Sequence, residues 1–168
     1  MRKRLDNKGF SLIEVIIALA IIMVVSGSII SFLLAGSRSY SSVITTTDLQ
    51  KEAQLVMNQI SDIVISAEKE VRYADSTLEV INENEKYEIS YVPAEKKIYY
   101  KKSVIDTMSR SFELKENVLM AENVTAFSAD VIRAEGKNKI RVKMNLKNNS
   151  QSYVKEEIIT PRNENVVK

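Results

Sequence analysis

One acidic side chain, Glu14, stands near the start of an apolar stretch and is the residue whose chemistry most needs an explanation. After it, residues 15–35 form a run of 21 that is interrupted only by Ser26, Gly27, Ser28 and Ser31. About 20 apolar residues are enough for a helix to cross a bilayer. A carboxylate inside hydrocarbon costs roughly 2.5 to 3.5 kcal/mol on insertion scales. Glu14 is therefore expected to have a charged partner or a task.

Gly9 and Phe10, just ahead of Glu14, suggest what that partner is. Glycine lets a protease approach the backbone closely, which suits Gly9 to a cleavage site. Cleavage after Gly9 would leave a cationic amine on Phe10, which hydrocarbon also disfavours unless it is paired. Glu14 of a neighbouring subunit would neutralise that amine. The alternative is that Glu14 merely lies at the headgroup boundary of an ordinary signal anchor.

The sequence KGFSLIE at residues 8–14 resembles the processing site of type IV prepilins and of type II secretion and DNA-uptake pseudopilins. In that pattern a basic leader ends in Gly, Phe follows, and Glu is the fifth residue of the processed chain. The leader's basic residues here are Arg2, Lys3, Arg4 and Lys8. The resemblance implies that prepilin peptidase cleaves between Gly9 and Phe10 and methylates the new amine of Phe10. It also implies a pilin-like fold and assembly with other pilin or pseudopilin subunits on an assembly platform.

Two other N-terminal signals fit the same stretch less well. A secretory signal peptide would be cut near the small residues at 18–20, but the apolar run continues to Ala35, beyond the 7 to 15 residues that a signal core needs. A lipoprotein signal is suggested by residues 33–36, but Ser37 follows where a Cys would be acylated. An uncleaved, signal-anchored extracytoplasmic binding module remains the alternative to a pilin subunit.

The charge distribution predicts how the chain is oriented in the cell membrane. Residues 1–9 carry four basic side chains against Asp6, while the rest of the chain carries 20 basic and 21 acidic ones. Basic flanks of a membrane helix stay in the cytoplasm. We therefore expect a single-pass protein with its N-terminus in the cytoplasm and its C-terminal domain outside, later transferred to a pilus or pseudopilus.

Composition argues against most enzymatic functions. The 168 residues contain no Cys and no His, which removes thiol nucleophiles, disulfides, common zinc ligands and the imidazole base of hydrolytic triads. We therefore expect a protein that is not an enzyme and that has no cofactor and no metal. The length allows one small domain besides the anchor.

Beyond the apolar stretch the pattern predicts that the helix continues to Val71. Apolar residues recur in steps of three and four, which define one face of a helix. They are Leu49, Ala53, Val56, Met57, Ile60, Ile63, Val64, Ala67 and Val71. The predicted division is a basic leader at 1–9, a transmembrane and assembly helix at 10–35, and its amphipathic continuation at 36–72.

From residue 73 to 160 the sequence predicts an extracytoplasmic antiparallel β domain. Residues 139–146 alternate strictly, with Ile140, Val142, Met144 and Leu146 on the buried side, as a half-buried strand requires. Further strands are expected at 77–81, 87–92, 97–101, 112–114, 126–132 and 153–160. Residues 161–168 are expected to form a disordered polar tail. A helix followed by strands favours an α+β, pilin-like fold in which the long N-terminal helix packs on a small antiparallel sheet.

Basic residues gather in the last third of the chain and raise the question of DNA binding. Lys139, Arg141 and Lys143 are the candidate nucleic-acid contacts, within a group that also includes Arg133, Lys137 and Lys147. Such a strip would bind phosphates without regard to sequence and with strong salt dependence. We favour the alternative, a solvated strand face that its lysines protect from edge-to-edge pairing.

Overall fold

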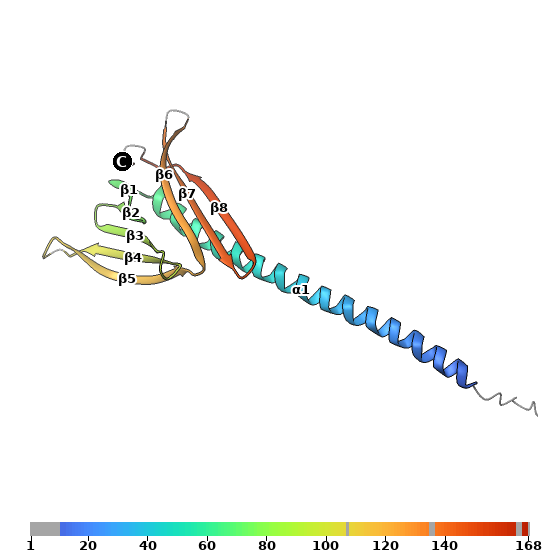
Figure 1. Ribbon diagram of the computed structural model, residues 1–168. Coiled ribbons are helices and arrows are strands. Elements are labelled where there is room, and N and C mark those ends of the chain that lie inside the picture. Colours follow the sequence, from blue (N-terminus) through green and yellow to red (C-terminus); the bar gives the residue numbers. More distant parts are fainter. Residues whose placement is uncertain (1–10, 107, 135–136, 164–165, 168) are drawn as a thin grey trace, which may run out of the picture. The chain divides into compact units, whose positions relative to one another are not determined.

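The computed structural model describes residues 11–106, 108–134, 137–163 and 166–167 (Figure 1). Along these residues the chain forms a helix and then strands, which confirms the predicted α+β, pilin-like class. The elements are α1 (Leu12–Ile65), β1 (Glu70–Ala74), β2 (Thr77–Ile81), β3 (Glu85–Val92), β4 (Lys97–Ile105), β5 (Phe112–Ala121), β6 (Val124–Ala134), β7 (Lys137–Asn148) and β8 (Gln151–Ile159).

The chain divides into two compact units, which meet within α1. We call the described residues up to Val43 the anchor segment and those from Ile44 onward the head. All residues of the buried apolar cluster lie in the head, between Leu49 and Val167. The core of the head is therefore complete without the anchor segment, as expected of a unit that folds on its own.

The buried face predicted for the second half of α1 is confirmed. The seven residues of the predicted stripe that lie in α1, from Leu49 to Val64, have at most 8% of their surface exposed. Polar residues between them, such as Lys51, Gln54 and Asn58, are exposed. The other two residues of the stripe, Ala67 and Val71, are also buried but lie beyond the end of the helix. Burial of this stripe against the sheets, rather than helix propensity, is what holds the amphipathic half in place.

The prediction that helix continues to residue 72 is wrong, because α1 ends at Ile65. Val71 belongs to β1, which pairs with β2 through a two-residue turn at Asp75 and Ser76. Both turn residues have positive φ angles, 49° and 60°, as a tight antiparallel hairpin requires. The apolar spacing by itself would continue the helical pattern past Ile65. Pairing of β1 with β2 places Val71 in a strand instead.

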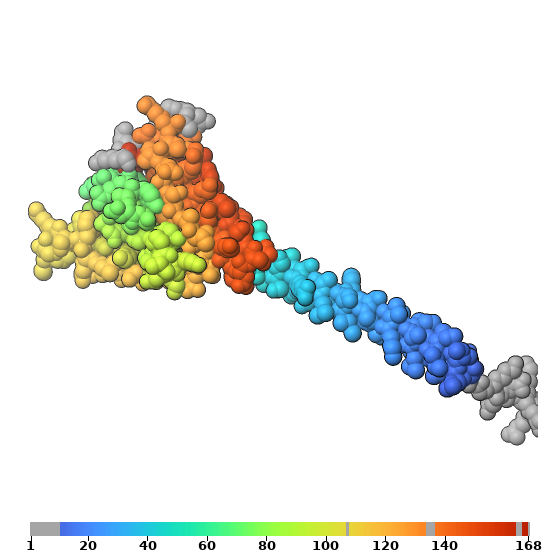
Figure 2. Space-filling model, viewed as in Figure 1, coloured from blue at the N-terminus to red at the C-terminus, as the bar shows by residue number. Residues whose placement is uncertain are grey.

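The strands form two antiparallel sheets instead of the single small sheet predicted. One has the order β1-β2-β3-β4-β5, and the other has the order β6-β7-β8. Two tyrosines of the five-stranded sheet donate hydrogen bonds to backbone carbonyls of β6: Tyr73 to Phe127 at 3.0 Å and Tyr91 to Val124 at 3.2 Å. β5 lies at the margin of the head (Figures 1 and 2).

The alternating strand predicted at 139–146 is the centre of β7. Ile140, Val142, Met144 and Leu146 all have at most 2% of their surface exposed. β7 is the middle strand of its sheet, so one of its faces covers the core while the other carries the polar residues. The predicted face assignment is confirmed.

The prediction of a disordered tail at 161–168 is wrong for the residues that the structure describes there. Val166 and Val167 are 1% and 7% exposed, and Val167 forms a parallel bridge with Val71 of β1. Earlier in this segment, the amide of Arg162 donates to the carbonyl of Ile65 at 3.2 Å, and the Asn163 side-chain amide donates to the Glu68 carbonyl at 3.4 Å. This C-terminal clasp, residues 161–163 with 166–167, therefore closes over the junction between α1 and β1.

Candidate processing and assembly site

The apolar half of α1 has its side chains exposed throughout the anchor segment. An 18-residue window of α1 has a mean hydropathy of 2.7, and none of it is buried within the protein. By length and composition this helix is able to cross a membrane. A long apolar surface without cover from its own chain must be covered by lipid or by other subunits.

Glu14 lies in the first turn of α1, three residues after Ser11. The Ser11 carbonyl accepts from the Glu14 amide at 3.0 Å and from the Val15 amide at 3.3 Å, so Ser11 occupies the N-cap position just before α1 begins at Leu12. Ser followed by Glu at this spacing is a capping-box pattern. This S-x-x-E spacing can be seen in the sequence alone, and it adds helix capping as a second candidate role for Glu14. Charge pairing and helix capping must therefore be separated by experiment.

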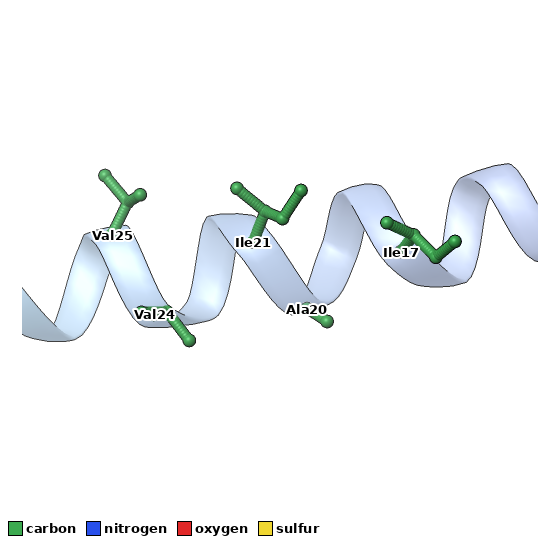
Figure 3. A pocket seen from close by; sticks show the side chains of 5 residues that line it. All are labelled: Ile17, Ala20, Ile21, Val24 and Val25. Atoms are coloured by element: carbon green, nitrogen blue, oxygen red, sulfur yellow. The ribbon is translucent and has the colours of Figure 1, made fainter.

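The surface beyond Glu14 contains an apolar depression on one helix. Ile17, Ala20, Ile21, Val24 and Val25 line it, and the small Ala20 side chain leaves space beside its larger neighbours (Figure 3). No polar side chain is among these lining residues. The depression can accept an apolar side chain or a lipid tail through dispersion contacts.

Two serines within the apolar half form their side-chain hydrogen bonds inside the helix. The hydroxyl of Ser28 donates to the Val24 carbonyl and that of Ser31 to the Gly27 carbonyl, each at 3.0 Å. Such bonding to the preceding turn makes serine tolerable in hydrocarbon. Added Cβ atoms at Gly27 and Gly36 would meet nothing within 4 Å, so neither glycine serves close packing within this chain.

The remaining residues predicted for processing lie outside the described residues. These are the cleavage and methylation positions Gly9 and Phe10 and the leader residues Arg2, Lys3, Arg4 and Lys8. The pairing of Glu14 with the amine of Phe10 in a neighbouring subunit therefore stays a prediction.

The basic residues considered for DNA binding project from a strand with acids on both sides. Arg141 stands opposite Asp130 of β6, and its guanidinium lies 3.5 Å from the Glu156 carboxylate of β8. Lys143 stands opposite the same Glu156. Lys139 lies on the same strand, two residues before Arg141. This arrangement breaks up the positive field that a phosphate backbone would need, so it supports a solvated strand face.

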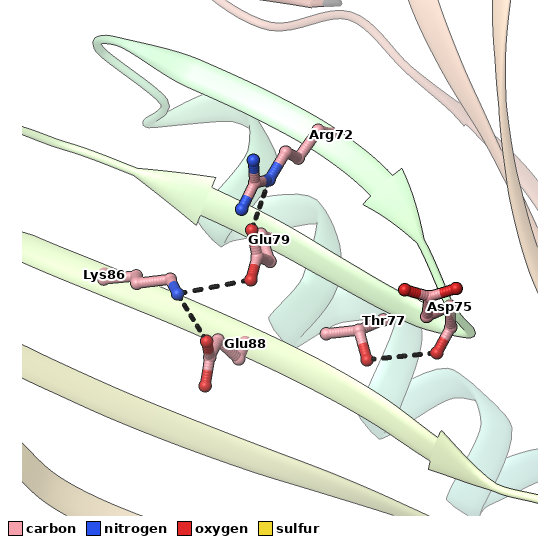
Figure 4. Close-up of polar contacts among 6 residues, drawn as sticks. All are labelled: Arg72, Asp75, Thr77, Glu79, Lys86 and Glu88. Carbon is pink, nitrogen blue, oxygen red and sulfur yellow. Dashed lines mark hydrogen bonds and ion pairs between the residues drawn. The ribbon is translucent and has the colours of Figure 1, made fainter.

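A second polar cluster occupies the outer face of the five-stranded sheet (Figure 4). Glu79 and Glu88 stand directly opposite each other on β2 and β3, a like-charge arrangement that by itself destabilises a sheet. Lys86 bridges them, with its ammonium 3.2 Å from Glu79 and 2.5 Å from Glu88, and Arg72 of β1 also pairs with Glu79. At the end of the hairpin, the Thr77 hydroxyl donates to the Asp75 carbonyl. The cluster offsets its own charges and therefore has a structural role.

The protonation of Glu79 should make the stability of the head depend on pH in the acid range. Partial burial acts to raise the pKa of Glu79, but hydrogen bonds from Arg72 and Lys86 outweigh it and hold the pKa below the ordinary 4.5. A depressed carboxyl pKa stabilises the folded state above the unfolded-state pKa, and this is lost as the pH falls through the folded-state value. We expect Glu79→Gln to cost about 1 kcal/mol in urea unfolding at pH 7. The difference from the unaltered head should shrink as the pH falls below 4.5.

The matched control for this prediction is Glu157→Gln, another strand carboxylate that forms no ion pair among the described residues. It should change the stability at pH 7 by less than Glu79→Gln does. A constant difference between the Glu79→Gln head and the unaltered head from pH 7 down to pH 3 would contradict the assigned ion pairs.

Comparison with known proteins places a family signature on the segment that holds Glu14. Residues 4–30 match the prokaryotic N-terminal methylation motif. No curated protein and no solved structure matches the chain significantly. The match covers the predicted cleavage position, Glu14 and most of the apolar stretch, and α1 continues beyond it to Ile65 before the antiparallel strands of the head begin. The chain is therefore a type IV pilin-like protein with a prepilin-type N-terminus and an apolar helix suited to membrane anchoring.

Proposed function

We propose that this protein is a structural subunit, a minor pilin or pseudopilin, of a type IV pilus-like filament in a pilus, secretion or DNA-uptake machine. Prepilin peptidase removes residues 1–9 and methylates Phe10. The protein then joins other pilin or pseudopilin subunits at the assembly platform. It catalyses no reaction itself.

The observation that carries this proposal is that the methylation motif coincides with an apolar helix that no other part of the described chain covers. The motif spans residues 4–30, and α1 begins at Leu12 within it. An ordinary signal anchor needs only an apolar segment, whereas a filament subunit needs a helix that exchanges lipid contacts for contacts with neighbouring helices. Glu14 lies in the first turn of this helix and supplies a negative charge that can pair with the amine of Phe10 in a neighbouring subunit.

Orientation in the membrane follows from the charge asymmetry of the chain. The basic leader stays in the cytoplasm until it is removed, and the head lies outside the cell membrane. Because the chain has no cysteine, the head has no disulfide and must keep its fold through noncovalent contacts.

Mass spectrometry of the N-terminus of the protein isolated from cells tests the proposal. The expected result is a chain that begins with methylated Phe10. A chain that keeps Met1 and never enters a filament would instead identify a signal-anchored binding module and overturn the proposal.

Replacing Gly9 with Val should block processing. A β-branched residue at the cleaved bond restricts the backbone and prevents the close approach that the peptidase requires. The full-length precursor should accumulate in the membrane and should run on a gel as a larger species than the processed, unaltered protein. Gly27→Val makes the same change within α1, where an added Cβ meets nothing within 4 Å, and should be processed normally.

A further inference from the structure

The edge strand β5 is the least covered strand of the head. Its first eight residues, from Phe112 to Leu119, are all exposed, and among the described strands it pairs only with β4. Apolar side chains point into solvent along it, with Leu114 53% and Val118 52% exposed. At the other end of the same sheet, β1 is bridged by Val167. An open edge with exposed apolar residues is a template for pairing with another strand.

The charges at the centre of β5 identify a second copy of this chain as a suitable partner. Glu113 and Lys115 flank Leu114, and their side chains are 62% and 51% exposed. In an antiparallel pair of identical strands centred on Leu114, each Glu113 stands opposite the other copy's Lys115. Two opposite-charge pairs then surround a contact between two leucines, and cross-strand pairs of this kind stabilise a sheet.

Other registers of β5 against itself lack this complementarity. Centring the pair on Lys115 or on Glu116 would set like charges directly opposite each other, which is destabilising. Centring it on Asn117 would leave Lys115 opposite Leu119 and Glu116 opposite Val118, with no charge paired. In the edge strand β8, Lys155 and Glu157 also flank a central residue. That residue is Glu156, however, so two copies of β8 paired there would set like charges opposite each other.

We infer that the heads of two copies associate through their β5 strands, antiparallel and two-fold symmetric, with Leu114 opposite Leu114. A register shift in the β4–β5 pairing leaves Lys115 without a partner on β4 and increases the local twist. The paired segment is therefore short and the contact weak, so confinement to one membrane supplies the effective concentration. A two-fold contact closes on itself and cannot extend a filament. The pair therefore forms between membrane-inserted subunits.

Disulfide trapping of the full-length protein in membranes tests the register. Because the chain has no cysteine, each variant carries a single introduced thiol. Opposed residues of an antiparallel pair have Cα atoms about 4.5 to 5.5 Å apart, which a disulfide can span. Leu114→Cys should give a dimer upon mild oxidation, whether or not the leader has been removed. Val118→Cys, on the same strand and equally exposed, should stay monomeric.

Charge exchange separates this pairing from random collision. In the Leu114→Cys background, Glu113→Lys and Lys115→Glu should each lower the dimer yield roughly fivefold or more, because each variant places like charges opposite one another twice. Co-expression of the two variants with different tags should restore a mixed dimer, because the lysines of one copy then stand opposite the glutamates of the other. The Glu113–Lys115 ion pair within each strand stays lost, so its return cannot explain the recovery. Protease resistance of the head confirms that each variant is folded. Equal trapping of Val118→Cys, no trapping of Leu114→Cys, or no mixed dimer would overturn the inference.

Discussion

Ending the chain after Thr160 should lower the free energy of unfolding of the head by about 2 to 4 kcal/mol. The deletion removes Val166 and Val167, which are almost completely buried, and burial of one such side chain contributes roughly 1.5 to 3 kcal/mol before the cost of ordering the chain. It also removes the hydrogen bond that the Arg162 amide donates to the Ile65 carbonyl at the end of α1. Thermal unfolding of a fragment that starts at Ile44 should show a melting temperature lower by roughly 10 °C.

Two point variants separate burial from simple shortening of the chain. Val167→Asp keeps the length but places a carboxylate in an apolar site, so it should destabilise the head about as much as the deletion. Asn163→Ala removes the exposed side-chain hydrogen bond of 3.4 Å to the Glu68 carbonyl but keeps Val166 and Val167, so it should destabilise the head much less than the deletion does. If the Val167→Asp head melts at the same temperature as the unaltered head, the C-terminal clasp does not form in solution.

The C-terminal clasp shows what the sequence could not indicate. Val166 and Val167 are two apolar residues in a polar segment, without the periodicity that predicts an element. Their burial depends on Val71, which lies far away in the chain. The same long-range pairing decides that Val71 belongs to a strand, because its spacing from Val64 and Ala67 also fits a helix. The turn at Asp75 and Ser76 has no glycine, so the strongest hairpin signal was missing.

Other parts of the fold could be read from local patterns. The stripe from Leu49 to Val64 and the alternation from Ile140 to Leu146 each repeat with one period over several turns or strand residues, and both faces were assigned correctly. Assignment to two sheets was not predictable, since strand order depends on contacts between distant segments. For the candidate site, motif spacing located Glu14 at the start of the helix, but that Ser11 directly precedes the first helical residue became evident only from the structure.

Replacing Glu14 with Gln should leave cleavage after Gly9 intact and reduce incorporation into filaments roughly a hundredfold. Gln retains the side-chain length and the capping-box pattern with Ser11, so the helix start is preserved. It removes the negative charge that we propose to pair with the methylated amine of Phe10 in the next subunit. An unpaired charge left in a low-dielectric environment costs roughly 3 to 5 kcal/mol, which is more than a hundredfold decrease requires. Comparison of membrane and sheared filament fractions on immunoblots measures the effect.

A series at the same position distinguishes charge pairing from capping and from hydropathy. Glu14→Ala should also be processed and assemble poorly, but it loses both the charge and the cap. Glu14→Asp keeps the charge on a shorter side chain and should restore part of the incorporation. If capping were the role of Glu14, Gln would assemble as well as Glu and Ala alone would fail. Normal incorporation of both Glu14→Gln and Glu14→Ala would show that the membrane helix tolerates this position without a partner, and the proposed pairing of subunits would have to be abandoned.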